Sequence, residues 1–509
     1  MKKTFALVLA VMLVLTALPM MTAGAEGERV TLTMLQRLPA AYVVEDNPVI
    51  EAWGDLLGFD IEIEAPPISS FNDRRNIIMA SGELPDIMYV GDTGTNYVQW
   101  ATDGLFLNLT PYFNDEYLPN PVRVLTEDEL STVRIASLDG DIYSLPRVQT
   151  KPWDNIMYRK DWLDALNLEV PKTPAEFAQV ALAFATQDPD GNGENDTYGW
   201  ALSLAMGPEH RQMLSGFGVR PSEVPDENGV YTHMYNQPAY MEYLDWLRDM
   251  YATGAMDPEF YLITMYEDDD WFYAGELGIK YCNTVTEHMI TVKNNETFKA
   301  ANPNAQLVAG APLMKEGESV ANVYYNPQVW GNYAINADTE YLTEALHFLN
   351  MGYTDEVNEL LMFGVEGITY TEFNAETRSA TKTEEQKLNA DKYVASYATI
   401  NYQLEDKGLL IANGDTAEDV ALFTEAYNYV GALTNRVSYL SGGSLPGISD
   451  VNVAITDEGI DTTFEELRTK YICGQIEREE LVSFLENTWA PAVQPILDIY
   501  AANNWNAAK

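Results

Sequence analysis

The chain has 509 residues, of which 46% are hydrophobic, and its formal net charge is -47. This length exceeds one ordinary domain and supplies enough apolar side chains for a large core. Because phosphate binding requires lysine and arginine, the strong acidity excludes nucleic acid as a natural partner and disfavours anionic membrane surfaces.

Residues 1–25 are typical of a secretory signal peptide. Lys2 and Lys3 precede an apolar run over residues 5–18, and an Ala-Gly-Ala sequence then provides a small-residue cleavage site. We expect the mature, exported protein to begin at Glu26. No later stretch of the sequence is long and apolar enough to predict a bilayer-spanning helix.

Strand and helix patterns alternate in the first part of the mature chain. Strands are expected over 30–35 and 59–63, a short buried strand over 87–90, and helices over 49–57 and 72–80. This order predicts a mostly parallel sheet with helices on both faces. Ligands of such sheets bind outside the carboxyl ends of the strands, which points to four residues: Gln36, Arg37, Asp92 and Thr93.

A first crossing to a second lobe is expected at residues 139–152, which contain glycine and proline but little helical pattern. Beyond it, Thr173 and Glu176 form a capping box with proline at the first helical position. Four apolar residues then recur on one face of the helix: Phe177, Val180, Ala181 and Phe184. We therefore expect a capped helix that leads directly into an acidic loop.

The acidic loop places oxygen-bearing side chains at alternate positions, a pattern that suits calcium. Gly193 occupies the sixth position, as the calcium-loop pattern requires, but the twelfth position is Gly199 and not glutamate. The sequence thus predicts a shortened, structural calcium loop with five ligand residues: Asp188, Asp190, Asn192 and Asp196 by side chain, and Glu194 by its carbonyl. The alternative is a turn of Asx and glycine residues without a metal.

The later patterns predict a return to the first lobe. Helices are expected over 241–251, 340–351, 423–433 and 464–500, and strands over 275–281 and 329–335. Residues 370–405 are polar and are interpreted as an inserted hairpin or loop.

Several of these segments resemble one family. The run RKDWLDALNLEVPKTPAEF followed by DPDGNGENDTYG is similar to the carbohydrate-type extracellular solute-binding proteins of ABC importers, in particular to their large members with a calcium loop. Further segments match in the same order: Met79–Ile87, Asp103–Pro111, Asp139–Arg147, Phe363–Tyr370 and Leu467–Tyr500. These segments are distributed over most of the mature chain.

The resemblance implies an α/β fold of the periplasmic-binding-protein-like type II, with two α/β lobes joined by a hinge. The implied division gives residues 26–148 to lobe 1, 149–317 to lobe 2 with the calcium loop, 318–372 to a return segment of lobe 1, and 373–509 to the rest of lobe 2 with bracing helices. Family members often carry a lipid-modified cysteine after the signal peptide. The two cysteines here are Cys282 and Cys473, and neither lies at this junction, which favours a soluble exported protein over a lipid-anchored one. The sequence leaves open whether the two cysteines pair or stay free.

A sugar site requires aromatic platforms for the C–H faces of the ring and polar groups for its hydroxyls. The aromatic candidates at strand ends and crossings are Trp153, Trp200, Trp271, Trp330 and Tyr333. The polar candidates are Gln36, Asp92, Asn283 and Glu366. The alternative for each aromatic residue is a place in the core, which is what we expect of Trp162 because it shares a helix face with Leu166.

Catalytic signatures are absent from the sequence. The four histidines lack metal-ligand spacing, and neither a G-x-S-x-G nucleophile elbow nor a phosphate-binding P-loop occurs. We therefore expect a non-enzymatic protein, and the family resemblance implies a monomer that captures an oligosaccharide between two lobes and delivers it to a membrane permease. The alternatives are a receptor for a peptide or other small solute and, from another class, a secreted carbohydrate-active enzyme.

Overall fold

The computed structural model describes residues 29–39, 41–91, 94–135, 138–147, 155–194, 196–202, 210–263, 267–282, 289, 292–326, 331–374, 379–394, 403–404, 408–409, 417–442 and 445–506. The predicted signal peptide lies outside these ranges. None of the helices in the described ranges combines the length and the hydropathy that crossing a bilayer requires.

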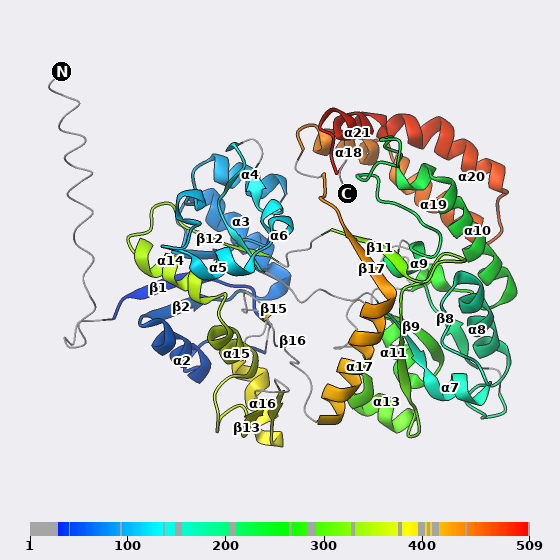
Figure 1. The fold of residues 1–509 in the computed structure, drawn as a ribbon, viewed down its shortest axis with the longest axis horizontal. Helices are drawn as coiled ribbons and strands as arrows, with labels where there is room; N and C mark the ends of the chain where they lie inside the picture. The colour runs from blue at the N-terminus through cyan, green and yellow to red at the C-terminus, as the bar shows by residue number, and fades with distance from the viewer. Residues whose placement is uncertain are drawn as a thin grey trace.

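The first body is built on a five-stranded sheet (Figure 1, blue, cyan and yellow-green). Its strand order is β2 (Asp60–Glu64), β1 (Thr31–Leu35), β3 (Ile87–Tyr89), β12 (Asn332–Ile335) and β6 (Leu145–Pro146). The first three strands are parallel, and β12 is antiparallel to both of its neighbours. The helices of this body are α2 (Pro48–Leu57), α3 (Phe71–Ser81), α4 (Thr95–Thr102), α5 (Pro119–Val124), α6 (Glu127–Ser131), α14 (Leu342–Met351) and α15 (Asp355–Phe363).

Local sequence signals explain why helix α2 forms where it does. The Asn47 side chain accepts hydrogen bonds from the backbone of Val49 and Ile50, and Gly58 ends the helix in a left-handed conformation with φ 84°. The helix then buries Trp53 against Phe348 of α14, with ring centroids 5.2 Å apart. Capping thus sets the ends of the helix, and packing on the later return segment holds it to the sheet.

The second body has a four-stranded sheet in the order β10 (Leu307–Gly310), β7 (Asn155–Arg159), β9 (Leu277–Cys282) and β8 (Tyr198–Trp200). Strand β7 runs antiparallel to β10 and β9, and β8 runs parallel to β9. The surrounding helices are α7 (Lys160–Ala165), α8 (Pro174–Thr186), α9 (Arg211–Leu214), α10 (Pro238–Thr253), α11 (Glu267–Ala274), α13 (Glu296–Ala301) and α17 (Ala417–Leu433).

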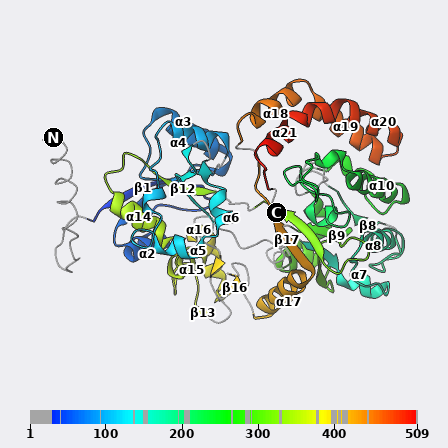
Figure 2. The ribbon, with the colours of Figure 1, turned by 45° about the horizontal axis from the view of Figure 1, so that its top comes forward.

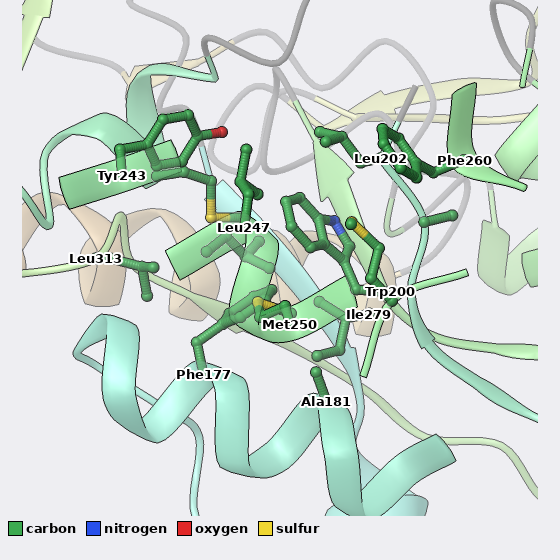
Figure 3. Packing of buried hydrophobic residues seen from close by; sticks show 14 of the residues in the cluster. Phe177, Ala181, Trp200, Leu202, Tyr243, Leu247, Met250, Phe260, Ile279 and Leu313 are labelled. Atoms are coloured by element: carbon green, nitrogen blue, oxygen red, sulfur yellow. The ribbon is translucent and has the colours of Figure 1, made fainter. Parts of the chain in front are cut away.

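The capping box predicted for the helix before the acidic loop is confirmed. Thr173 and Glu176 make both reciprocal hydrogen bonds at the start of α8. The predicted apolar face is buried as well, and Figure 3 shows Phe177 and Ala181 directed from this helix into the core of the second body. Trp162, expected in the core, is 1% exposed and meets Phe184 edge to face at 5.3 Å.

A parallel two-stranded ribbon and a layer of helices complete the second body. The ribbon pairs β11 (Ala321–Tyr325) with β17 (Thr434–Ser438), strands more than a hundred residues apart in sequence. The C-terminal layer consists of α18 (Ile448–Asp457), α19 (Ile460–Ile472), α20 (Arg478–Phe484), the π-helical turn η8 (Leu485–Trp489) and α21 (Ala490–Ala502). Figure 2 shows this layer curving over the rest of the second body from the end of the ribbon.

The two bodies have separate hydrophobic cores. One cluster takes its residues from Leu32 to Leu145 and then from Tyr333 to Leu361. The other cluster takes its residues from Ile156 to Leu313 and then from Ala426 to Val493. The chain therefore builds the first body, enters the second, returns to the first and finishes in the second.

Part of the segment after residue 372 lies against the first body. Val43 donates its backbone N–H to the carbonyl of Lys392, at the end of α16 (Glu384–Tyr393), over 2.8 Å. The Asn47 amide reaches the carbonyl of Tyr393, and the Tyr393 ring packs against the first core. The sequence interpretation assigned this segment to lobe 2. The lobe boundaries as a whole stay a prediction.

Candidate functional site

Two residues predicted at strand ends meet beneath the edge of the first sheet. Gln36, which follows β1, donates its side-chain amide to the hydroxyl of Tyr333 on β12 over 2.6 Å. Both side chains are fully buried, and the Tyr333 ring meets Tyr89 edge to face at 5.5 Å. Gly331 stands beside them at φ 119°, where a Cβ atom would lie 2.4 Å from the Tyr89 hydroxyl oxygen. The buried hydrogen bond and ring contact thus join the ends of β1, β3 and β12.

The structure separates the other described candidates. Trp200 is 1% exposed in the second core, with its ring 5.3 Å from Phe177 and 5.9 Å from Trp246, so it offers no face to a solute. Trp271 is half-buried and stacks on Tyr198 at 5.9 Å. Glu366 is exposed on a turn bridged to Tyr370. Four candidates lie outside the described residues: Asp92, Trp153, Asn283 and Trp330.

An aromatic pocket of about 430 Å³ lies beside the β11–β17 ribbon. Its walls come from α9, the loop over residues 219–223, the ribbon and the C-terminal helix layer. The aromatic side chains that line it are His233, Tyr235, Tyr324, Tyr439, Trp489 and Tyr500. The charged side chains that line it are Arg211, Arg220 and Glu223. We refer to this cavity as the ribbon pocket.

A larger groove of about 970 Å³ lies between α17, β10 and the start of α8. Its apolar lining is mainly aliphatic, and Tyr429 is the one aromatic residue in it. Small-molecule sites combine aromatic surface with a few convergent polar groups. The ribbon pocket meets this description better, although it is the smaller of the two.

Burial shifts the pKa values of three titratable groups of the ribbon pocket: His233, Tyr439 and Glu223. His233 accepts the Trp489 indole N–H at its Nδ1 atom over 3.1 Å, which leaves the ring proton on Nε2. Burial lowers the pKa of His233 to about 4 and raises the pKa of Tyr439 to about 12. Burial also raises the pKa of Glu223. The hydrogen bond that the Gly442 N–H donates to the Glu223 carboxylate opposes this shift. At neutral pH the imidazole and the phenol are therefore hydrogen-bonding groups without charge.

The ribbon pocket was missed in the sequence interpretation. Its residues come from segments that start near 211, 322, 439 and 489, and no spacing rule relates such distant segments. The available signal was the density of tyrosine around residues 324–325 and 427–439, which does not by itself distinguish a pocket from a core.

His210 gives the protein a measurable pH dependence. His210 is 8% exposed, and its ring lies tilted against Tyr281 with the ring centroids 4.4 Å apart. Burial lowers the pKa of His210 from 6.5 to about 4, while Asp268 opposes and Arg211 adds to that shift. In the unfolded chain the imidazole binds a proton below pH 6.5, so stability is lost as pH falls from 6.5 towards 4. We expect His210 to account for about 2 kcal/mol of this loss at pH 5.

Urea unfolding at pH 7 and pH 5 measures this effect. The His210→Gln variant should lose less stability than the parent over that interval, because glutamine does not titrate. An equal loss in both proteins would contradict the prediction.

The acidic loop between α8 and β8 partly has the geometry of a cation loop. Asp188 adopts φ 48° and accepts the Gly193 N–H at Oδ2 over 3.1 Å, which closes the turn. Its other oxygen, Oδ1, is buried without a hydrogen-bond partner in the described structure. Burial and the neighbouring carboxylates of Asp188 and Asp196 raise the pKa of Asp190. An unmatched buried oxygen among like charges is a position that favours a cation.

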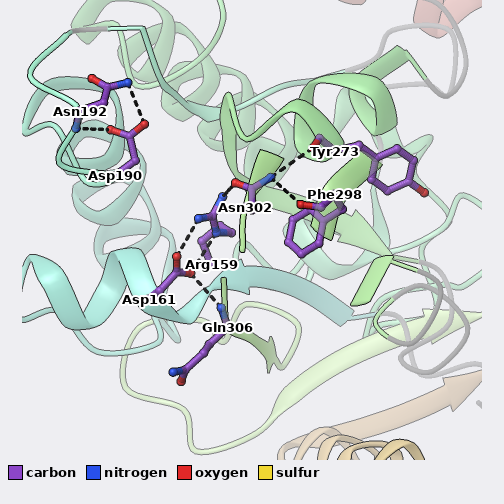
Figure 4. Close-up of polar contacts among 8 residues, drawn as sticks. All are labelled: Arg159, Asp161, Asp190, Asn192, Tyr273, Phe298, Asn302 and Gln306. Carbon is purple, nitrogen blue, oxygen red and sulfur yellow. Dashed lines mark hydrogen bonds and ion pairs between the residues drawn. The ribbon is translucent and has the colours of Figure 1, made fainter. Parts of the chain in front are cut away.

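The same loop does not form a closed carboxylate cage. The Asn192 side-chain amide donates to Asp190 over 2.9 Å and to Asp196 over 3.2 Å, and so lies between the two carboxylates (Figure 4 shows the Asp190 contact). Within the described ranges, no three or more His, Cys, Asp or Glu side chains are grouped so that they could hold a metal ion. The donor types fit calcium, but the predicted ligands do not all converge.

Two curated relatives align with parts of the chain. Lipoprotein LipO of Bacillus subtilis is 28% identical over 284 residues, which is 55% of each protein. The polygalacturonan/rhamnogalacturonan-binding protein YtcQ of the same organism is 24% identical over 332 residues, covering 65% of this chain and 64% of YtcQ. The chain thus spans between half and two thirds of the length of these relatives.

Solved structures share the fold over nearly the whole chain. An extracellular solute-binding protein from Bifidobacterium longum subsp. infantis has a TM-score of 0.71 and 17% identity, covering 94% of this chain and 99% of that one. Streptococcus pneumoniae FusA in complex with kestose has a TM-score of 0.68 and 18% identity, with 94% and 100% covered. Alginate-binding protein AlgQ2, described as without calcium ion, has a TM-score of 0.62 and 18% identity, with 93% and 98% covered.

These likenesses confirm the predicted α/β, periplasmic-binding-protein-like fold of two lobes. The model of the family described as bacterial extracellular solute-binding protein matches residues 47–359, which is more than half of the chain. The match includes strands and helices from both bodies and the acidic loop, and it ends before the C-terminal helix layer. The chain therefore belongs to the bacterial extracellular solute-binding protein family.

Proposed function

We propose that this protein is the extracellular substrate-binding component of an ABC importer and that it carries an oligosaccharide to a membrane permease. Family membership carries the proposal, and the structure adds two α/β bodies with separate cores. The names of several relatives and neighbours refer to saccharides: polygalacturonan and rhamnogalacturonan for YtcQ, and kestose for the FusA complex. Each of these names describes the relative.

Two lobes allow a solute to shift the equilibrium between open and closed forms. A solute stabilises the closed form only by the difference in its affinity for the two forms, and closure then presents both lobes to the permease. In the lobe-1 half of such a site, Gln36 and Tyr333 hold the sheet edge. The other residues of the proposed site are those predicted from the sequence: Asp92, Trp153, Trp271, Asn283, Trp330 and Glu366.

Titration calorimetry against a panel of oligosaccharides tests this function. We expect one class to bind in the micromolar range or tighter and to make the protein more compact in solution scattering. Uniformly flat titrations on folded protein would overturn the saccharide proposal. Binding of short peptides alone would favour a peptide receptor, and shortened products after long incubation would favour an enzyme.

We also propose that the acidic loop binds calcium as a structural ion. The ion would be held by the side chains of Asp188, Asp190 and Asp196, by Asn192 after its amide turns its oxygen inward, and by the Glu194 carbonyl. It would neutralise the carboxylates and tie the end of α8 to β8. Support comes from the buried, unmatched Asp188 Oδ1 and from a FusA structure whose name includes an EF-hand mutant.

Calcium should raise the melting temperature, and a chelator should lower it without unfolding the protein. At a hundredfold excess of ion over its dissociation constant, mass action stabilises the native state by about 2.7 kcal/mol. Asp188→Ala should remove the response, and Asp457→Ala, a distant acidic residue, should keep it. Identical melting curves of the parent with calcium and with chelator would contradict the site.

The family description is extracellular, and we propose that residues 1–25 direct export through the cytoplasmic membrane. Amino-terminal sequencing of secreted protein tests this directly. Recovery of protein that begins at Glu26 is expected.

A further inference from the structure

We propose that the ribbon pocket is a saccharide subsite that binds the end of the solute, and that Trp505 and Asn506 at the C-terminus hold its wall in position. This inference rests on the proposed function, because it specifies where one end of an oligosaccharide lies. The pocket volume of about 430 Å³ is at the lower end of the range for small-molecule sites, about 300–1,000 Å³, as suits one end of a longer solute.

The pocket walls match the two faces of a sugar ring. Tyr324, Tyr439 and Tyr500 supply aromatic surface, which packs against the C–H face of a ring. Within the described residues, no hydrogen bond is recorded for any of these three hydroxyls. Burial is the main cause that keeps the Tyr439 phenol protonated. Each hydroxyl is therefore able to donate to one sugar oxygen and accept from another.

Arg220 adds a donor that lacks an acceptor. Its Nε–H is buried and has no hydrogen-bond partner in the described structure. A buried donor without an acceptor costs free energy, and an oxygen atom of a bound solute recovers it. Arg220 also acts electrostatically on Tyr324 of the ribbon and on Asp226, and its positive charge acts to lower the pKa of both groups.

The C-terminal residues join the two segments that form this wall. The Asn506 side chain exchanges two hydrogen bonds with the backbone of Leu440, 2.8 Å from its N–H and 2.9 Å to its carbonyl. The same amide reaches the carbonyl of Glu223 over 3.3 Å. Trp505 donates its indole N–H to the Leu440 carbonyl over 2.9 Å. Tyr439 immediately precedes Leu440, so the hydrogen bonds from Asn506 to Leu440 and Glu223 hold the tyrosine segment next to Glu223.

The wall is also joined to α21 and to the first body. Tyr231 donates its hydroxyl to the Trp505 carbonyl over 2.6 Å, and a Cβ atom on Gly442 would lie 2.2 Å from the Tyr500 ring. Ser438, next to Tyr439, donates its hydroxyl to Asp128 of α6 over 2.7 Å. A solute against Tyr439 thus lies one residue along the chain from a contact between the two bodies, so its affinity can differ between the open and closed forms.

Calorimetry on pocket variants tests the subsite, with the tightest saccharide of the panel as the probe. Arg220→Met should weaken binding about tenfold or more, because it removes a charged donor. Tyr439→Phe removes a single hydroxyl and should weaken binding a few-fold. Tyr261→Phe, which removes a hydroxyl from an exposed tyrosine, should leave the affinity unchanged.

Hydrogen exchange tests the positioning role without any solute. In Asn506→Ala the Leu440 amide should exchange faster, because its acceptor is gone, and saccharide affinity should fall with it. Asn503→Ala is the matched control, since the Asn503 side chain bonds only within its own helix. A purely structural clamp would give faster exchange of the Leu440 amide with unchanged saccharide affinity, and that result would overturn the positioning role.

The outcomes separate this inference from the function beneath it. If the parent binds a saccharide and both Arg220→Met and Tyr439→Phe bind it equally well, the subsite is wrong and the transport function stands. If the parent binds no saccharide in the panel, the proposed function fails and the subsite fails with it. Tyr439→Phe keeps the test decisive if Arg220→Met does not fold.

Discussion

Replacing Asp161 with alanine should lower the free energy of unfolding by about 3–5 kcal/mol, because it strands a buried guanidinium. The Arg159 side chain is 5% exposed and is held by both carboxylate oxygens of Asp161, at 2.9 and 2.7 Å (Figure 4). It also donates to Asn302 over 2.7 Å and lies 4.6 Å from the Trp162 ring centroid. Without Asp161, the asparagine is the acceptor that remains, and it carries no charge.

The same helix provides the control for this prediction. Asp164→Ala breaks the ion pair with Lys160, whose side chains are 58% and 43% exposed. Exposed pairs of this kind contribute about 0.3–0.5 kcal/mol. In urea unfolding, Asp161→Ala should therefore lose several times more free energy of unfolding than Asp164→Ala. Equal losses in the two variants would show that burial of the Arg159 pair does not matter.

The Gly199→Ala variant should lose more than about 3 kcal/mol, beyond the usual effect of one extra methyl group in a core. A Cβ atom at residue 199 would lie 2.0 Å from the carbonyl oxygen of Ala181, and 2.6 and 2.7 Å from its carbonyl carbon and Cα. All three atoms are backbone of α8, so no side-chain rotation relieves the contact. Strand β8 would have to move off the helix.

Gly254→Ala separates close packing from the general cost of replacing glycine. Gly254 ends α10 at φ 79° and has open space where its Cβ would be. Its replacement should cost about 1 kcal/mol, from the left-handed conformation alone. Thermal unfolding of both variants gives the comparison, and a loss at Gly199 no larger than at Gly254 would contradict the packing argument.

Gly199 also explains why the acidic loop departs from the calcium-loop pattern. The pattern requires glutamate at the twelfth position, which Gly199 occupies. The approach of β8 to α8 leaves no space for any side chain there. The missing glutamate is therefore a consequence of packing between these two elements, and the sequence alone showed the absence without its cause.

Local patterns predicted the elements that depend on nearby residues. The capping box at Thr173 and the apolar face of α8 are examples, because their hydrogen bonds and spacing lie within a few residues. The three parallel strands of the first sheet were placed within one residue at each end for the same reason, whereas β6 was not predicted. The helix predicted over 464–500 is interrupted near Gly474, which adopts φ 70°, and again at η8.

Features that join distant segments were not predictable from such patterns. Trp200 was proposed as a sugar platform, but β8 directs its ring into the core against Phe177 of α8. The pairing of β11 with β17 depends on a return of the chain after the whole of α17. The ribbon pocket requires that return and the C-terminal layer as well, so its residues share no local signal.

The interleaved path of the chain has a consequence for the order of assembly during synthesis. The described buried residues of the first core have emerged once the chain reaches Leu361, and only partly buried residues such as Tyr393 are added later, whereas the second core still lacks Leu481, Trp489 and Val493. A nascent or prematurely terminated chain thus presents one finished half and one half with uncovered apolar surface, the kind of species that aggregates. The last fifty residues act as the closing step of maturation, and damage there should reduce yield more than damage of equal size near the start.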